Sequence, residues 1–273
     1  MKKLLAVLLC IIMLFAFSAC SGDEPGAESV DASAESSEDA PITIRIGTYN
    51  IANGRNVAHD FQILADDIKE ADCDIIGIQE VDVNCNRSKN QDTPKILAEL
   101  SGYEYYAFFR CIDYDGGQYG TCILSKYPII ETSDVELNDG SEVERRVLAC
   151  AKIDLGGTVI NYYNTHLTVH RDDIRVNDEL PIIASALAGV ERCILTGDFN
   201  VDGFDEFELL APLATTNNDD HPFTTYPGDG DAARMIDNIL FSEEFTLIEE
   251  SIAMRENNHS DHYLFYADYE IVG

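Results

Sequence analysis

The chain alternates, from residue 42 onward, between segments with the period of a strand and segments with the period of a helix. Residues 43–50 alternate and are rich in β-branched side chains, which predicts a strand. Apolar residues then recur at helical spacing over 61–68, directly behind Asp60, a good N-cap. Residues 74–79 form a short apolar run typical of a buried strand, and Thr93-Pro94 indicates the first turn of a second helix.

Four strand-like runs follow with no obvious helix between them, at residues 119–125, 129–137, 146–155 and 159–166. Short turns that contain Gly or Pro separate these runs, as in an antiparallel meander. A helical stretch then ends near Ala188, and three more strands are predicted at residues 193–199, 235–241 and 262–269. Because strands and helices alternate without an internal repeat or linker after residue 41, mixed sheets covered by helices, in a sandwich of two sheets, fit this order best.

The first nineteen residues predict an export signal. Met1-Lys2-Lys3 is positively charged, and residues 4–17 are almost unbroken apolar sequence, too short for a comfortable membrane span. Small residues lead directly into Cys20, as in a bacterial lipoprotein signal, so we expect cleavage before Cys20 and lipid on its sulfur. The protein would then be anchored at the outer face of a bacterial membrane, at the cell surface or in the periplasm. An ordinary signal peptide that happens to contain Cys20 is the alternative.

Residues 20–41 follow as an acidic, disordered tether, and residues 42–273 form one domain. The full chain has 50 Asp and Glu against 18 Lys and Arg, a net charge of -32, and most of the acidic residues lie in the domain. Affinity for nucleic acid comes mostly from Lys and Arg on phosphates, so this charge disfavours extended nucleic acid as a partner. A local phosphate site built around a metal ion remains compatible with it.

Cysteine positions predict buried thiols and one candidate disulfide. Cys122, Cys150 and Cys193 lie inside apolar runs and are expected to be buried thiols. Cys85 and Cys111 lie in polar, loop-like sequence, and in an exported protein they are the best candidates to pair.

Polar residues end or interrupt six of the apolar segments, and this repeated pattern is the strongest functional signal in the chain. A carboxylate in such a run is costly to bury unless it is paired, hydrogen-bonded or bound to metal. One example alone would indicate a turn, but the repetition indicates a shared site. The residues are Asn50, Glu80, His166, Asp198, Asn200, Asp237, Asp261 and His262.

These residues lie in short motifs that occur in a fixed order. The motifs are Thr48-Tyr49-Asn50, Gln79-Glu80, Tyr119-Gly120, Asn164-Thr165-His166-Leu167, Gly197-Asp198-Phe199-Asn200 and Ser260-Asp261-His262. Together they resemble the endonuclease/exonuclease/phosphatase superfamily, which includes deoxyribonuclease I, abasic-site endonucleases, neutral sphingomyelinases and inositol polyphosphate 5-phosphatases. The resemblance implies an α/β fold, a four-layer sandwich of two mixed, mainly antiparallel sheets packed face to face with helices outside.

The resemblance also implies a metal site. Glu80, helped by Asn50 and Asp261, is similar to the family's seat for a hard divalent cation. Mg²⁺ is the most natural ion and Mn²⁺ the alternative, because oxygen ligands with few protein contacts suit an ion that keeps several waters. Asn50 could instead be only a turn former at a strand end.

The remaining site residues are similar to the family's catalytic groups. His262 with Asp237 resembles a His–carboxylate pair that activates water, although Asp237 could merely pair with Arg234. Asp198 with Asn200 would orient the attacking water or stabilise the pentacovalent phosphate, and either Asp198 or His262 could be the base. His166 would donate to a nonbridging phosphate oxygen.

Three further residues are weaker candidates for phosphate contact. Tyr119 could reach a phosphate, or it could be an ordinary strand aromatic beside a turn. One of Arg145 and Arg146 could clamp a phosphate, or pair with nearby carboxylates. The chain also departs from the family's usual pattern at Thr121, at Thr168-Val169-His170 and at Asn238, positions expected near the substrate rather than the metal.

The resulting hypothesis is a divalent-metal-dependent phosphoester hydrolase, a phosphodiesterase or phosphatase, that acts as a monomer on a small or lipid-linked phosphoester. A secreted or surface endonuclease of the deoxyribonuclease type is the first alternative. A non-catalytic binding module on the same fold is the second, although the intact motifs argue against it.

Overall fold

The structure is a computed structural model that describes residues 41–201, 203–227 and 233–272. The predicted signal segment, the lipidated Cys20 and all of the tether except residue 41 therefore lie outside the described residues. Among the helices of the described part, none combines the length and apolar character needed to span a membrane.

In the part of the chain that the structure describes, twelve strands form two six-stranded sheets. The first sheet has the order β11-β12-β1-β2-β4-β3, with β1 (Ile42–Asn50), β2 (Ile75–Val83), β3 (Tyr105–Tyr114), β4 (Gly117–Ser125), β11 (Phe245–Arg255) and β12 (Leu264–Ile271). The second has the order β5-β6-β7-β8-β10-β9, with β5 (Ile129–Glu136), β6 (Val147–Asp154), β7 (Val159–His166), β8 (Cys193–Asp198), β9 (Ala214–Thr215) and β10 (Asp237–Phe241). Within them, β1–β2 and β7–β8 pair in parallel and the other neighbours are antiparallel, which confirms mixed, mainly antiparallel sheets.

The helices cover the outer faces of the sheets. The first sheet carries α1 (Phe61–Ala71) and α2 (Thr93–Ser101), and the second carries α4 (Leu180–Leu187), preceded by α3 (Asp172–Ile174) and a π-helical turn η2 (Arg175–Glu179). The described residues also include two 3-10 segments, η1 (Ala52–Val57) and η3 (Phe204–Leu210). Asp60 caps α1 by accepting a hydrogen bond from the Gln62 amide, as its position predicts.

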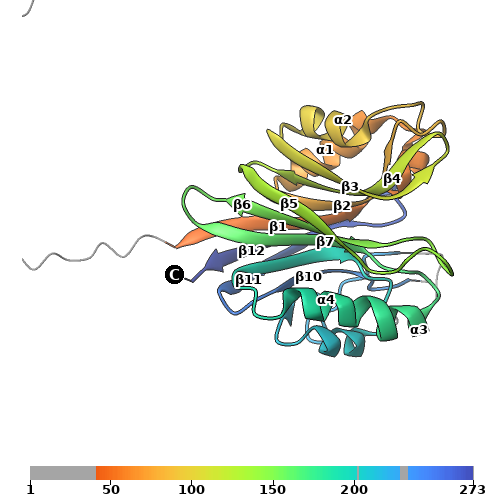
Figure 1. Ribbon diagram of the computed structural model, residues 1–273. Helices are drawn as coiled ribbons and strands as arrows, with labels where there is room; N and C mark the ends of the chain where they lie inside the picture. Colours follow the sequence, from red (N-terminus) through yellow and green to blue (C-terminus); the bar gives the residue numbers. More distant parts are fainter. Residues whose placement is uncertain (1–40, 202, 228–232, 273) are drawn as a thin grey trace, which may run out of the picture. The chain divides into compact units, whose positions relative to one another are not determined.

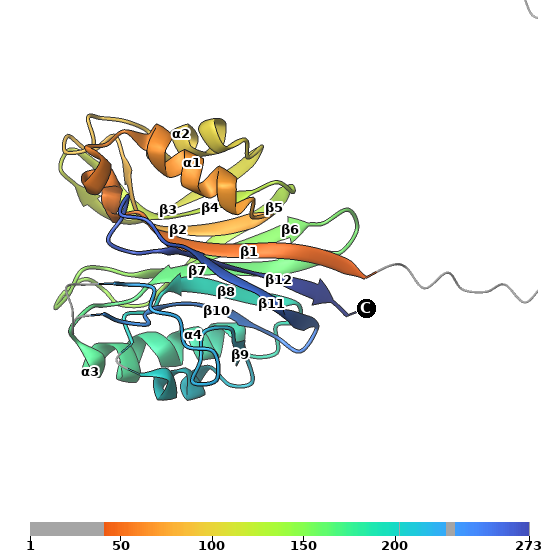
Figure 2. The same cartoon turned by 180° about the vertical axis from the view of Figure 1, so that it is seen from behind.

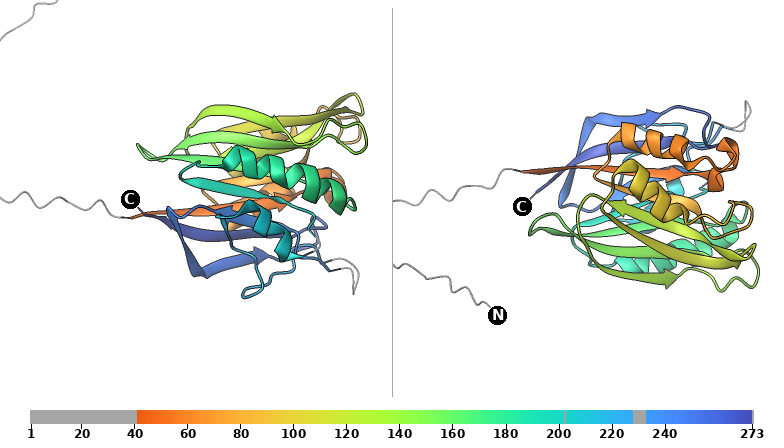
Figure 3. Two further views of the ribbon diagram at one scale, coloured as in Figure 1. Left: turned by 60° about the horizontal axis from the view of Figure 1, so that its bottom comes forward. Right: turned by 90° about the horizontal axis from the view of Figure 1, so that it is seen from above.

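The four layers are held by three apolar interfaces (Figures 1 and 2). Between the sheets, Ile44 and Ile46 of β1 belong to the same buried cluster as Tyr162 of β7 and Ile194 of β8. Residues of α1 and α2 pack on the outer face of the first sheet, where the two helices lie side by side (Figure 3, right). Because α4 packs in the same way on the second sheet, the predicted four-layer sandwich is confirmed.

One detail of the predicted topology is wrong. The strand at residues 119–125 does not belong to the meander, because β4 forms a hairpin with β3 in the first sheet and only β5, β6 and β7 form the meander. Both β3 and β11 were missed by the sequence pattern. They are edge strands whose side chains are mostly part-exposed on both faces, so they lack the alternation of a half-buried strand.

The predicted disulfide between Cys85 and Cys111 is also wrong, since all six cysteines of the described residues are free thiols. The Cys85 thiol is buried and donates to the carbonyl oxygens of Tyr114 and Gln118, each at 3.2 Å. Cys111 packs in the core between the sheets. Both cysteines, Cys85 after β2 and Cys111 within β3, therefore use their sulfur as a buried small group, which polar neighbours in the sequence concealed.

A polar layer crosses the interface between the two sheets below the strand ends. The Asn164 amide nitrogen on β7 donates to the carbonyl oxygens of Ile78 and Cys122 on the opposite sheet, at 3.1 and 3.0 Å. Its amide oxygen accepts from Gln79 Nε2 at 2.7 Å. Gly77 makes room for this contact, because a Cβ there would lie 2.6 Å from the Asn164 amide oxygen. Asn164 therefore fixes how one sheet is seated on the other.

We expect Asn164→Leu to lower the free energy of unfolding by about 2–4 kcal/mol, because two carbonyls and the Gln79 amide lose their buried partner. Asn161→Leu is the matched control, because Asn161 lies on the same strand with its amide directed to the Glu191 carbonyl near the surface. Urea denaturation followed by circular dichroism measures both. Equal losses for the two variants would contradict the special role of Asn164.

Candidate functional site

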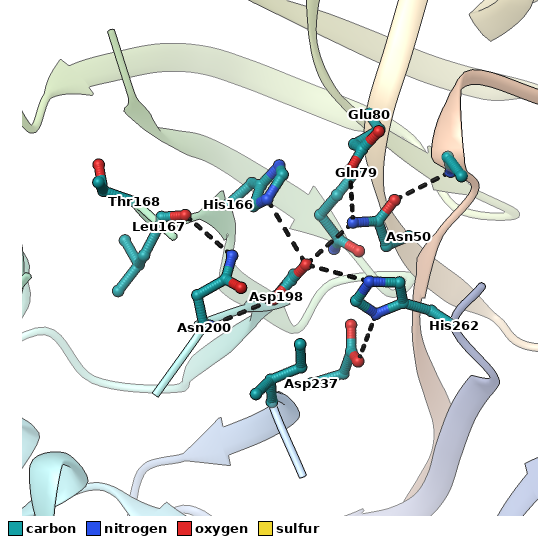
Figure 4. Close-up of polar contacts among 12 residues, drawn as sticks. Asn50, Gln79, Glu80, His166, Leu167, Thr168, Asp198, Asn200, Asp237 and His262 are labelled. Carbon is teal, nitrogen blue, oxygen red and sulfur yellow. Dashed lines mark hydrogen bonds and ion pairs between the residues drawn. The ribbon is translucent and has the colours of Figure 1, made fainter. Parts of the chain in front are cut away.

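The site lies where strand ends of both sheets meet. In the second sheet, His166 ends β7 and is paired in parallel register with Asp198 at the end of β8. Asp237 begins β10 and is paired with Asp198 from the other side. Strand pairing alone therefore places these three side chains next to one another, and β1 and β2 of the first sheet bring Asn50 and Glu80 to face them (Figure 4).

Asp198 is the centre of the polar contacts drawn in Figure 4. Its Oδ2 accepts a hydrogen bond from Asn50 Nδ2 at 2.9 Å, and it lies 3.5 Å from His166 Nε2 and 3.6 Å from His262 Nε2. Its Oδ1 accepts from the backbone amide of Asn200 at 3.2 Å. Asp198 is buried, and burial raises the pKa of its carboxyl above the usual range, with a smaller contribution in the same direction from the Asp237 charge.

Glu80 is directed into the site by a β-bulge. The pairing of β2 with β4 shifts register between Ile78 and Val81, and Glu80 has φ +57°, an unusual value for a residue other than Gly. Ile78 and Val81 both pack toward the helices, so the strand period is broken between them. The Glu80 carboxylate accepts from Asn50 Nδ2 at 3.2 Å. The strain of the bulge is therefore associated with one carboxylate at the rim of the site.

His262 is held by a buried carboxylate. Its Nδ1 lies 2.8 Å from Asp237 Oδ2, and because a carboxylate only accepts, Nδ1 carries the proton and donates. Burial alone would lower the pKa of His262, but the Asp237 and Asp198 charges outweigh it and raise the pKa to about 10. Tyr226 packs edge-on against the ring, with centroids 5.1 Å apart. The ring is therefore fixed in place and protonated at neutral pH.

His166 has the opposite electrostatic environment. Arg146 Nη1 lies 3.2 Å from its Nδ1, and because a guanidinium only donates, Nδ1 accepts and the proton of the neutral ring sits on Nε2, toward Asp198. Burial, the Arg146 charge and the His262 charge all lower the pKa of His166 well below 6.5. The two imidazoles beside Asp198 therefore differ in charge, one neutral donor and one cation.

An arginine lies between two acidic groups at the mouth of the site. Arg55 follows the left-handed turn at Asn53 and Gly54 after β1, and its Nη1 is 3.8 Å from Glu80 Oε2. The other terminal nitrogen is hydrogen-bonded to Asp261 Oδ2. Ser260 holds the loop that carries Asp261 against the end of β1, because its hydroxyl donates to the Asn50 carbonyl oxygen at 2.7 Å. Glu80 and Asp261 thus face one positive group from opposite sides.

A cavity of ≈ 470 Å³ opens onto these groups. Its lining includes eight of the predicted site residues: Glu80, Tyr119, Arg146, His166, Asp198, Asn200, Asp261 and His262. Asn50 and Asp237 lie directly behind this lining, in contact with Asp198 and His262. The structure therefore brings nearly the whole predicted set together.

Arg145 is the predicted residue that the structure does not bring to the cavity. Its Nε pairs with Glu136 at 2.7 Å, and its Nη1 donates to the carbonyl oxygens of Arg110 and Cys111. The neighbouring Arg146 is buried and lines the cavity, paired with Glu144 at 2.7 Å. Alternation of adjacent residues explains the split, because neighbours at the start of a strand point to opposite faces.

Sequence reasoning missed several lining residues. Tyr226 and Arg234 line the cavity and are joined by an isolated β-bridge in a turn-rich segment that has no strand pattern. No sequence signal marks these two. Val169 and His170, which were expected near the substrate, also line the cavity. Arg55 could have been found, because it follows a strand-end Asn through an Asn-Gly turn that folds the chain back toward that strand end.

Two groups of side chains could hold a metal ion. Asp198, Asp237 and His262 present ligand atoms that all lie within 4.8 Å of one another. The second group is the carboxylates of Glu80 and Asp261, which offer oxygen atoms. Asn50 lies behind them and donates from its amide nitrogen to Glu80. The first includes a ring nitrogen that is already committed to Asp237.

Comparison with known proteins agrees with this arrangement. Residues 47–262 match the model of the endonuclease/exonuclease/phosphatase family, from just before Asn50 to His262. No curated protein matches the chain.

Solved structures share the fold at low sequence identity. An endonuclease/exonuclease/phosphatase protein from Beutenbergia cavernae is 21% identical, with a TM-score of 0.70 over 85% of this chain and 72% of that one. Truncated TDP2 from Caenorhabditis elegans is 18% identical, with a TM-score of 0.62 over 84% and 98%. A mannosyl-6-phosphatase from Bacteroides thetaiotaomicron is 19% identical, with a TM-score of 0.59 over 84% and 100%.

We expect the His262 ring to keep its proton through neutral pH and lose it near pH 10, and Asp237→Asn to lower this pKa. The raised pKa stabilises the fold fully below pH 6.5, and this contribution is lost as the pH rises toward 10. Histidine NMR titration measures the pKa, and Asp134→Asn on the exposed β5 is the control. An unchanged His262 pKa in Asp237→Asn would contradict the electrostatic account.

Proposed function

Because the chain belongs to the endonuclease/exonuclease/phosphatase family, a family of phosphoester hydrolases, we propose that it is a divalent-metal-dependent phosphoester hydrolase. The observation that carries the proposal is the placement of buried Asp198 between a neutral and a charged imidazole, beside the acidic pair Glu80 and Asp261. A merely structural carboxylate would need neither two histidines of different charge nor an open cavity in front of it.

The proposed metal seat is Glu80 and Asp261, with Asn50 in support. The two carboxylates supply oxygen ligands, which suit Mg²⁺ or Mn²⁺, and Asn50 supports them by donating from Nδ2 to Glu80. The fit is supported by Arg55, since its guanidinium already lies between the two carboxylates and shows that they attract a cation there. When bound, the ion would polarise the phosphate and neutralise its developing charge. Asp198, Asp237 and His262 are less suited, because they include a nitrogen ligand and a committed hydrogen bond.

We assign Asp198 as the general base. A base works best when its pKa is near the working pH, and burial raises the pKa of this carboxyl toward that range. Asn50 and the Asn200 amide fix the orientation of its two oxygens. Protonated His262, held by Asp237, is then a stabiliser of negative charge rather than the group that takes the proton. His166, with Nε2–H toward the same place, donates to a nonbridging phosphate oxygen.

The substrate class we favour is a small or lipid-linked phosphoester. A cavity of ≈ 470 Å³ accommodates a phosphate and a modest substituent. Acidic groups at its wall and rim, Glu144 and Asp261 among them, would repel a second phosphate of a long polyanion. The mannosyl-6-phosphatase relative acts, by its name, on a small phosphorylated sugar.

We further propose that the protein is exported and anchored through lipid on Cys20, as the apolar start and the small residues before that cysteine indicate. Intact mass spectrometry of the protein from the membrane fraction tests this. A mature chain that begins elsewhere, or carries no acyl mass on Cys20, would contradict it.

The activity is tested on bis(p-nitrophenyl) phosphate, p-nitrophenyl phosphate, plasmid DNA and sphingomyelin, each with Mg²⁺ and with EDTA. We expect Mg²⁺-dependent hydrolysis of a small or lipid ester, and we expect His262→Gln to lower kcat about 10²–10⁴-fold. His221→Gln is the matched control, since His221 is exposed and outside the cavity. If wild type and His262→Gln are equally inert on all four, the enzyme proposal fails, and plasmid nicking as the main activity would favour an endonuclease.

We expect Arg55→Gln to bind Mn²⁺ about tenfold more tightly than wild type in the absence of substrate, because the ion no longer displaces a positive group from Glu80 and Asp261. Isothermal titration calorimetry with Mn²⁺ measures the affinity. Arg110→Gln is the control, because Arg110 is exposed and pairs with Asp113 on its own strand. Weaker binding by Arg55→Gln would place the metal elsewhere.

A further inference from the structure

Leu167, the residue that follows β7, is hydrogen-bonded both to Asp198 at the end of β8 and to Asn200 just beyond it. The backbone amide of Leu167 donates to the Asp198 carbonyl oxygen at 2.9 Å. The Leu167 carbonyl oxygen accepts from Asn200 Nδ2 at 3.1 Å, which sets the amide plane of Asn200 (Figure 4). His166 is the residue immediately before. The position of residues 166–168 therefore decides how two cavity groups are oriented against Asp198.

The next residue, Thr168, is held by a buried carboxylate outside the cavity. Glu179 Oε2 accepts from the Thr168 backbone amide at 2.9 Å, and Oε1 accepts from the Thr168 hydroxyl at 2.6 Å. Oε1 also accepts from Asn138 Nδ2 at 2.7 Å. Arg175 Nη1 donates to the Thr168 carbonyl oxygen at 3.2 Å. Every polar group of Thr168 is thus bonded to Glu179 or Arg175.

Both of these residues come from the π-helical turn η2, and both are fully buried. Arg175 makes a bidentate pair with Glu206 on η3, at 2.8 and 2.9 Å, which fixes the turn to the next element. A buried carboxylate is costly and weak support for stability by itself. π-Helical turns are rare and are frequent at functional sites, and this one holds the residues that follow His166 at the end of β7.

The chain departs from the resemblance at position 168. The Asn164-Thr165-His166-Leu167 motif resembles one that relatives often continue with an Asp-His pair, where this chain has Thr168-Val169-His170. The Glu179 carboxylate reaches Thr168 from the helix side and accepts its amide and hydroxyl hydrogens. A carboxylate therefore lies beside position 168 in this chain, and η2 supplies it.

We propose that Glu179 is a positioning residue for the reaction. It holds Thr168, and through residues 166–167 it orients His166 and Asn200 against Asp198, in place of an acidic side chain at position 168. This inference rests on the proposed hydrolase function for its kinetic consequences, but the geometry it predicts at Asn200 does not depend on activity.

The test compares Glu179→Gln with the double variant Glu179→Gln/Thr168→Asp, which moves the carboxylate to position 168. Glutamine replaces one accepting oxygen with an NH₂ group that only donates. Whichever way its amide is turned, either the Thr168 backbone amide or Asn138 Nδ2 then faces a donor instead of an acceptor. With bis(p-nitrophenyl) phosphate or p-nitrophenyl phosphate, whichever wild type cleaves, we expect Glu179→Gln to lower kcat about 10–100-fold with little change in KM. We expect the double variant to recover most of this loss.

Two controls separate positioning from folding and from the proposed function. Asp178→Asn changes the neighbouring acidic residue, which is exposed, and is expected to leave kcat unchanged. The side-chain amide NMR signals of Asn200 are expected to shift in Glu179→Gln and to return toward wild type in the double variant, even if no substrate is cleaved. An inert wild type with these shifts would remove the hydrolase proposal alone. Unshifted Asn200 signals, an unchanged kcat, or a kcat that falls only with the folded fraction would overturn the positioning role.

Discussion

The seating of one sheet on the other by the Asn164 amide is the constraint on which the site depends. Glu80 and Asn50 come from the first sheet, whereas His166, Asp198 and Asp237 come from the second. Apolar packing between sheets is not directional and would tolerate sliding. Hydrogen bonds from Asn164 to two carbonyls of the opposite sheet are directional, so they set the distance between the two halves of the site.

The same strand that donates this amide ends in His166 two residues later, so the seating and the chemistry share one element. The bulge in β2 is the complementary device, because it lies beside the Ile78 carbonyl that Asn164 uses and redirects Glu80 toward Asp198. A regular β2–β4 pairing without the bulge would satisfy the backbone hydrogen bonds of β2, but it would turn the Glu80 carboxylate away from Asp198. Local strain at Glu80 is thus offset by contacts that span the two sheets.

The strand ends were predictable from the sequence, because an apolar run indicates a buried strand and the polar residue that follows it marks where the strand ends, as at Asp198 and Asn50. It failed where geometry depends on partners far along the chain. Arg146 reaches the cavity and Arg145 does not. Adjacent residues point to opposite faces of the chain, and the sequence does not show which of two neighbouring arginines faces the cavity. Tyr226 and Arg234 lie in a turn-rich segment, and β3 and β11 are edge strands whose exposure removes the period. The disulfide prediction failed because the carbonyl acceptors of the Cys85 thiol and the burial of Cys111 between the sheets are invisible in sequence.

The buried carboxylates of the site already have positive partners, whereas Glu80 and Asp261 share one exposed arginine. A further cation is therefore needed only beside Glu80 and Asp261. His262 and Arg146 already supply positive charge against Asp237 and Glu144, and His166 is neutral. Glu80 and Asp261 instead share Arg55, a partly exposed group that can move away. Exchange of this side chain for a divalent ion would cost little, whereas loss of the buried pairs would leave charges unpaired. The strongly acidic surface raises the local concentration of cations and repels polyanions, so it is compatible with a metal-assisted reaction on one small phosphoester.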